Sequence, residues 1–237
     1  MKNRIKSIIS ICLSLALLSS VGINTVAASD VSIGELSVVT VRFVAESDYE
    51  VIKDSIGEPV ILLTRVEELN QNSRSSGKSY VSTTVAVVPT DDEEMERILE
   101  DIALLRGSGN MTEDEWFYAS SLYLKSTVSF TTTSSGGFVY IGMDKVTIEM
   151  KVNSGTTITS ASLYMVQYGI KLGGGTTTTQ KVTYDATTTR TFNAPTSWVK
   201  VLHNGLGTLV GANLTAYVSR PGGASSNFSL PNTISQG

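Results

Sequence analysis

Apolar and polar residues alternate along most of the second half of this 237-residue chain. In 145–152 every second residue is Val, Ile or Met, and the residues between them are Lys, Thr and Glu. This period of two indicates a strand that buries one face. Residues 122–130 repeat the pattern, which places Leu122 on the expected apolar face and Tyr123 and Lys125 on the polar face.

Further strands are expected between turns rich in Gly and Asn. They span 138–141, 157–170, 179–184, 188–193, 198–203, 209–219 and 226–230. Seven to nine short strands over about 120 residues predict an antiparallel β-sandwich, Ig-like in broad architecture. The predicted strands carry charged residues on one face, which argues against a parallel sheet, because a parallel sheet is buried on both sides. An open barrel is the alternative arrangement.

The first half predicts a small strand region with a hairpin. Residues 36–44, 60–66 and 80–88 are rich in β-branched residues, and a polar stretch at 70–78 separates the second run from the third. Such a pair of apolar runs around a polar turn is typical of a β-hairpin. Pro89 then ends the third strand.

One amphipathic helix is predicted from about 91 to 106. Its apolar residues recur at helical spacing: Met95, Ile98, Leu99, Ile102 and Leu105. Thr90 and Glu93 form a capping box at the start, and Arg106 with Gly107 marks the end. The acidic first turn suits the helix dipole, so we interpret its acidic face as a solvated surface rather than a metal site.

The N-terminus has the pattern of a secretory signal peptide. Lys2, Arg4 and Lys6 give a positive start, residues 8–23 carry no charge, and cleavage is expected after Ala28. The alternative is a retained membrane anchor. The apolar run is interrupted, however, and is a poor match to a membrane span of roughly 20 apolar residues. We therefore expect export from a Gram-positive cell and no membrane span once the signal is removed.

Four regions follow from these patterns. Residues 1–28 are the signal, 29–107 an acidic strand-and-helix region, 108–115 a Gly- and Ser-containing linker, and 116–237 the β-sandwich domain. The first of the exported regions is also a possible pro-segment, because charge is unevenly distributed along the chain.

The signal holds three of the 18 basic residues and none of the 22 acidic residues, so the exported chain carries a net charge near −7. Residues 29–116 have a net charge of −12, whereas 117–237 have a net charge of +5. This asymmetry indicates either separate partners or a contact between the two parts. Clusters of Arg and Lys are lacking, so we expect no nucleic acid partner.

The exported chain has few residues suited to catalysis. The only cysteine, Cys12, lies in the signal, and the only histidine, His203, stands beside an Asn-Gly turn. Zinc sites built from several His and Cys ligands and cysteine nucleophiles are therefore excluded. Phosphate-binding loops, calcium loops and Gly-x-Ser-x-Gly elbows are also lacking from the sequence. We predict no catalytic residue, no metal and no cofactor.

Paired carboxylates remain as an enzymatic alternative, since glycosidases need only two. The sandwich half offers Asp144, Glu149 and Asp185. A hydrolase would require Asp144 and Asp185 to face one cleft. Glu149 is expected on a charged strand face, in the setting of an ordinary cross-strand ion pair.

A lysine-to-asparagine crosslink assisted by a buried acid is a second hypothesis. Lys125, Glu149 and either Asn227 or Asn232 have the order that such a crosslink needs along a sandwich. The Lys and Glu positions fall on polar faces, however, which argues against it.

Aromatic side chains are the candidates for sugar stacking. They are Trp198 and five tyrosines: Tyr123, Tyr140, Tyr164, Tyr168 and Tyr217. Of these, Tyr140, Tyr164 and Trp198 are expected in the core, because aromatic residues fill sandwich cores. The sequence alone leaves the binding residues unknown.

Three segments carry a resemblance to known proteins: Trp116–Leu124, Pro195–Leu202 and Val210–Ala216. They resemble a loose group of uncharacterised small secreted proteins from Clostridia and related Firmicutes. The resemblance covers roughly the C-terminal half, and its motifs are structural in kind. It implies no activity, cofactor or site residue for this chain.

These observations favour a secreted, non-enzymatic β-sandwich protein that acts as an extracellular or cell-surface binding module. The expected partner is a cell-wall or surface glycan, or another protein. The first alternative is a bacteriocin-like effector or toxin made with an acidic pro-segment. The second is the two-carboxylate hydrolase.

Overall fold

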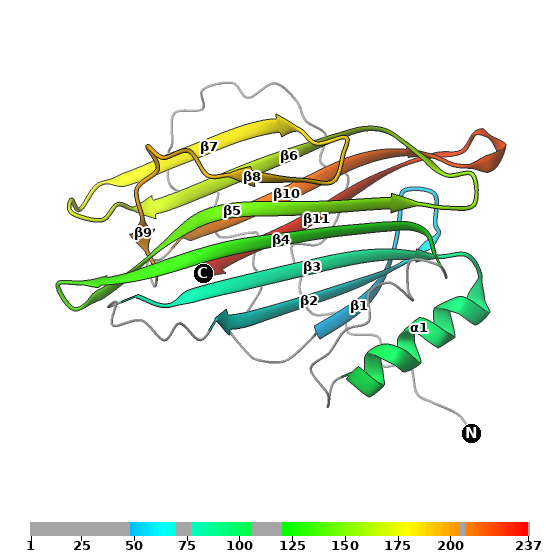
Figure 1. The fold of residues 1–237 in the computed structure, drawn as a ribbon, viewed down its shortest axis with the longest axis horizontal. Helices are drawn as coiled ribbons and strands as arrows, with labels where there is room; N and C mark the ends of the chain where they lie inside the picture. The colour runs from blue at the N-terminus through cyan, green and yellow to red at the C-terminus, as the bar shows by residue number, and fades with distance from the viewer. Residues whose placement is uncertain (1–47, 70–76, 106–119, 204–206, 237) are drawn as a thin grey trace, which may run out of the picture. The chain divides into compact units, whose positions relative to one another are not determined.

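The described strands of the chain form two antiparallel sheets, accompanied by one α-helix (Figure 1). This computed structural model describes residues 48–69, 77–105, 120–203 and 207–236. The predicted mainly β, two-sheet fold is confirmed. The signal, the predicted strand at 36–44 and the linker at 108–115 lie outside the described residues.

The larger sheet has seven strands in the order β1-β2-β3-β4-β5-β8, and β9 pairs with β5 beyond this path. Its strands are β1 (Asp48–Lys53), β2 (Pro59–Leu69), β3 (Ser79–Pro89), β4 (Ser120–Ser135), β5 (Phe138–Val152), β8 (Arg190–Asn193) and β9 (Val201–Leu202). The predicted hairpin of the second and third runs is confirmed as β2 and β3. The runs predicted at 138–141 and 145–152 form one continuous strand, β5.

The smaller sheet has four strands in the order β11-β10-β6-β7. Its strands are β6 (Thr157–Ile170), β7 (Thr177–Asp185), β10 (Thr208–Ser219) and β11 (Ser225–Gln236). A short 3₁₀ turn, Pro221–Gly223, joins β10 to β11. The long β10–β11 hairpin pairs from Thr208–Gln236 to Ser219–Ser225.

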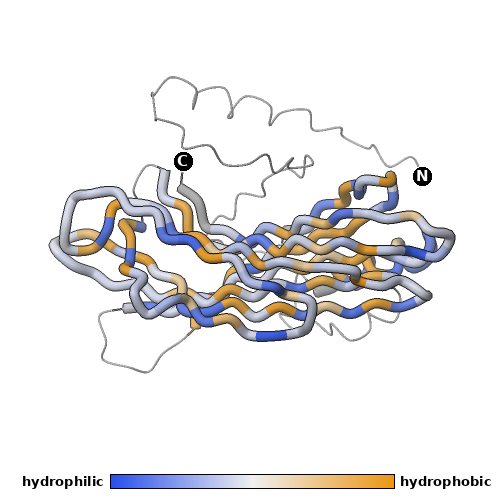
Figure 2. Tube along the Cα trace, turned by 90° about the horizontal axis from the view of Figure 1, so that it is seen from above, coloured by the Kyte–Doolittle hydropathy of each residue, from blue (hydrophilic) through white to orange (hydrophobic). Residues whose placement is uncertain are grey.

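The two sheets pack face to face through the apolar side chains of alternate residues. Hydrophobic and hydrophilic positions alternate along the strands in Figure 2. Leu122, Leu124, Val128 and Phe130 lie in this core, as the alternation predicted. The facing side chains of the smaller sheet come from every second residue of its strands: Leu163, Met165, Val210, Ala212, Leu214, Ala216, Val218, Phe228 and Leu230. Burial of one side of each strand is thus what holds the layers together.

The predicted domain boundary falls between two neighbouring strands of the larger sheet. β3 pairs with β4 in antiparallel register along its whole length. Val60 of β2, Ala86 of β3 and Leu124 of β4 lie in the same core cluster. The acidic N-terminal region and the region after the linker therefore share one sheet and one core.

Helix α1 (Asp92–Leu105) packs on the outer face of the larger sheet. It contributes Ile98 and Ile102 to a second apolar cluster with residues of three strands: Ile61, Leu63, Val85, Val87 and Tyr123. Tyr123 is only 1% exposed, so its expected place on a polar face is wrong. The helix covers it, and a strand covered on both sides no longer alternates apolar with polar.

The start of α1 differs from the predicted capping box by one residue. The Glu94 amide donates to the carboxylate of Asp91 at 2.9 Å, the usual geometry of an acidic N-cap. Arg97 forms exposed ion pairs on the solvent side with Glu94 at 2.7 Å and with Asp101 at 3.8 Å. The predicted C-terminal signals, Arg106 and Gly107, lie outside the described residues.

Candidate functional site

The outer face of the four-stranded sheet presents tyrosines among small polar residues. Ala161, Leu163 and Met165 of β6 point into the core, so the residues between them point outward. The same parity applies to β10 and β11. We call the outward side chains of β6, β10 and β11 the tyrosine face; its polar members are Ser160, Ser162, Tyr164, Tyr168, Asn213, Thr215, Tyr217, Asn227 and Ser229.

Two tyrosines of this face are well exposed. Tyr217 is 50% exposed and Tyr164 is 38% exposed, whereas Tyr168 is half-buried. The prediction that Tyr164 belongs to the core is wrong, because it alternates with the buried Leu163 and Met165 and so points outward. The suggestion that Tyr217 is available for stacking agrees with its exposure.

The three tyrosines follow the strand direction at nearly equal intervals. Tyr217 of β10 lies opposite Ser160 of β6, and Tyr164 stands four residues further along β6. At about 3.3 Å per residue and about 4.8 Å between strands, the Tyr217 and Tyr164 positions are about 14 Å apart. Tyr168 follows after another four residues, or about 13 Å.

The tyrosine face is uncharged over the described lengths of β6, β10 and β11 up to Thr233. Lys181 and Asp185 lie on the flanking strand β7, opposite Val166 and Ser162. The Ser229 hydroxyl donates to the Asn213 side-chain oxygen at 2.9 Å, which fixes the orientation of the amide. The face thus offers hydroxyl and amide groups and aromatic rings, but no charge.

The remaining aromatic candidates are less accessible. Tyr123 is covered by α1. Trp198 is partly buried against the main core, as predicted. Tyr140 is half-buried on β5. Among the aromatic residues that the sequence singled out, Tyr164 and Tyr217 are therefore the most exposed.

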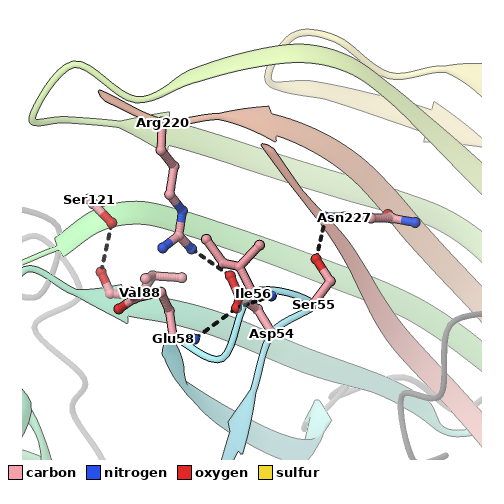
Figure 3. Close-up of polar contacts among 8 residues, drawn as sticks. All are labelled: Asp54, Ser55, Ile56, Glu58, Val88, Ser121, Arg220 and Asn227. Atoms are coloured by element: carbon pink, nitrogen blue, oxygen red, sulfur yellow. Dashed lines mark hydrogen bonds and ion pairs between the residues drawn. The ribbon is translucent and has the colours of Figure 1, made fainter. Parts of the chain in front are cut away.

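A buried ion pair joins the β1–β2 turn to the end of β10 (Figure 3). The Arg220 guanidinium donates to Asp54 Oδ2 at 2.8 Å, and the side chains are 11% and 1% exposed. The other oxygen of Asp54 accepts the amides of Ile56 and Glu58 at 3.0 and 2.9 Å. The guanidinium also lies 5.8 Å from the ring centre of Phe228. This junction links the two sheets at one end. The sequence patterns did not predict it.

The carboxylates considered for hydrolysis have separate partners in different sheets. Asp144 of β5 accepts from Thr131 Oγ1 at 3.1 Å, whereas Asp185 accepts the Thr187 amide in the turn after β7 at 3.2 Å. Burial raises the pKa of Asp144, while the bond from Thr131 and the charge of Lys200 act in the opposite direction. Burial likewise lowers the pKa of Lys200.

Of the residues in the crosslink hypothesis, Lys125 and Glu149 lie on the outer face of the larger sheet, Asn227 lies on the tyrosine face of the smaller sheet, and Asn232 lies between the two sheets. Lys125 pairs with Glu149 at 3.3 Å on the face that carries Tyr123 and α1. Asn232 is fully buried between the sheets, where its amide donates to Ser82 O and Ser126 O at 2.9 and 2.7 Å. The structure therefore does not bring Lys125 and Asn232 together.

His203 follows β9, and its amide donates to Val139 O at 2.8 Å. Within the described ranges, no group of three or more His, Cys, Asp and Glu side chains is arranged to hold a metal ion. The helix of the described part of the chain is too short and too polar to cross a membrane.

Comparisons of the chain with models of protein families, with curated proteins and with solved structures gave no match.

Proposed function

We propose that this chain is an exported protein that acts by binding at or near the cell surface rather than by catalysis, and that it binds through the tyrosine face. The observation that supports the proposal most is the exposure of Tyr164 and Tyr217 on a sheet face without charge. A half-exposed tyrosine costs little conformational entropy to immobilise and brings both an apolar ring and a hydroxyl to a ligand.

The scaffold beneath this face supports the same proposal. β6 and β10 are the central strands of the smaller sheet, and each is hydrogen-bonded on both sides. Their inward side chains, Leu163 and Leu214 among them, are fully buried. The tyrosines are thus fixed on rigid strands, so that little ordering is needed when a ligand binds.

Cosedimentation with isolated Gram-positive cell walls tests the proposal. We expect the exported protein to sediment with the walls and the Tyr164→Ala/Tyr217→Ala variant to remain in solution. Phe138→Ala is the matched control, because Phe138 is 57% exposed but belongs to the larger sheet. A double variant that keeps the circular dichroism spectrum of the parent and still sediments with it would refute the proposal, and so would a parent protein that never binds.

A further inference from the structure

We propose that the ligand of the tyrosine face is a neutral polysaccharide that lies along the strands and stacks sugar rings on Tyr217, Tyr164 and Tyr168. This inference rests on the proposed function and adds the chemical class of the ligand. The apolar C–H side of a pyranose ring packs flat on an aromatic ring, and its hydroxyl edges bond to amide and hydroxyl groups.

The three tyrosines are regularly spaced along the strands. Successive intervals are about 14 and 13 Å, so the spacing is nearly equal. A ligand that makes the same contact at each tyrosine must repeat too, and a polysaccharide presents equivalent rings along its length. Contact with all three tyrosines requires a ligand of about 27 Å.

The described outward side chains of β6, β10 and β11 carry no charge up to Thr233. A ligand that repeats carboxylate, sulfate or phosphate groups along its length would lose hydration at this surface and gain only one cationic partner by register, Lys181 of the flanking strand. Nucleic acid binding in particular depends on neutralising phosphates with Lys or Arg, and the described parts of β6, β10 and β11 present neither on this face. The nearest charged residues by register are Lys181 and Asp185, and these have opposite signs.

Small polar side chains surround the tyrosines on this face. Ser162, Asn213, Thr215 and Ser229 provide short donors and acceptors close to the sheet. Protein interfaces share the enrichment in Tyr, but they are depleted in Ser and also gather Trp, Phe, Met and Arg, which the described outward positions of β6, β10 and β11 lack. A polyhydroxylated ligand, in contrast, needs many small polar contacts between its stacked rings. The composition of the face therefore favours a polysaccharide over a protein.

Affinity electrophoresis of the exported protein tests this inference. Gels contain mannan, xylan or soluble β-glucan as neutral probes, and alginate or heparin as charged probes. We expect retardation by at least one neutral polymer and none by the charged ones. Each Tyr→Ala change at the three positions should weaken binding roughly tenfold, equivalent to about 1.4 kcal/mol, whereas Tyr→Phe should keep most of it because the ring remains.

Titration calorimetry with oligosaccharides of the retarding polymer then tests the geometry. Affinity should rise with length until the oligosaccharide spans about 27 Å, and Phe138→Ala should bind like the parent. Retardation only by charged polymers, or affinity that is independent of length, would overturn the inference. If cell walls bind through these tyrosines while the neutral polymers do not, the ligand class is wrong and the proposed function stands. If the tyrosine variants bind walls like the parent, the proposed function itself fails.

Discussion

Replacing Arg220 with methionine should destabilise the protein more than any exposed Arg→Met change. The substitution keeps most of the apolar stem and removes the guanidinium, so Asp54 keeps two backbone amides but loses its cation. Removing one partner of a buried pair costs about 3–5 kcal/mol, because the other charge stays buried. The two amides still stabilise the carboxylate, so we expect about 3 kcal/mol.

Arg220 also contacts the ring of Phe228. At 5.8 Å from the ring centre, the guanidinium contributes about 0.5–1 kcal/mol as a cation–π interaction, and this part is lost as well. The Asp54→Asn/Arg220→Met double variant should recover much of the loss, since no charge then remains at the junction. The double-mutant cycle therefore isolates the coupling between the two side chains.

Urea unfolding followed by circular dichroism measures these differences. Arg97→Met is the matched control, because Arg97 pairs with Glu94 at 2.7 Å on the exposed side of α1, and surface pairs contribute about 0–1 kcal/mol. A loss of under 1 kcal/mol for Arg220→Met, or equal losses for the two arginines, would show that the junction is not a buried ion pair.

Three further predictions follow from the same structure. Gly211→Ala should lower the free energy of unfolding in urea by about 1–3 kcal/mol, because the added Cβ would overlap the backbone oxygen of Asn232. Gly175→Ala is the control and should have little effect, since no atom lies near its added carbon. Equal losses for the two variants would contradict this packing. Burial raises the pKa of Asp144, so the folded state binds this proton more tightly than the unfolded state. The parent should therefore lose stability relative to Asp144→Asn as the pH rises above the ordinary pKa of Asp, and an opposite trend would refute the cause. A protease cut engineered within 106–119 should leave both fragments eluting together in size-exclusion chromatography, because β3 stays paired with β4; separation of folded fragments would support the pro-segment alternative instead.

The alternation of apolar and polar residues predicts most of the strands of the fold. Val146 and Ile148 are buried at the positions that a period of two predicts, since the side-chain period of a strand is fixed by its geometry. The helix was equally visible, because Ile98 and Ile102 repeat at its own period. Both signals are local, so a single sequence reveals them.

The features that were predicted wrongly or not at all depend mostly on contacts between distant segments of the chain. Tyr123 was misplaced because nothing in its own strand shows that α1 covers it. Arg220 and Asp54 are 166 residues apart, so their pairing depends on how the two sheets meet. The wrong placement of Tyr164 has a different cause. Its alternation with Leu163 and Met165 is visible in the sequence and predicts an outward side chain. The general preference of tyrosine for sandwich cores led to the opposite prediction.

Fluorine NMR of the exported protein labelled with 3-fluorotyrosine tests the central claim most directly. The chain has nine tyrosines, and single Tyr→Phe variants assign their resonances. On addition of solubilised cell-wall fragments, the resonances of Tyr164, Tyr168 and Tyr217 should shift, whereas that of Tyr123, buried under α1, should stay in place. Saturable binding that leaves these three resonances unchanged would contradict the assignment of the tyrosine face as the binding surface.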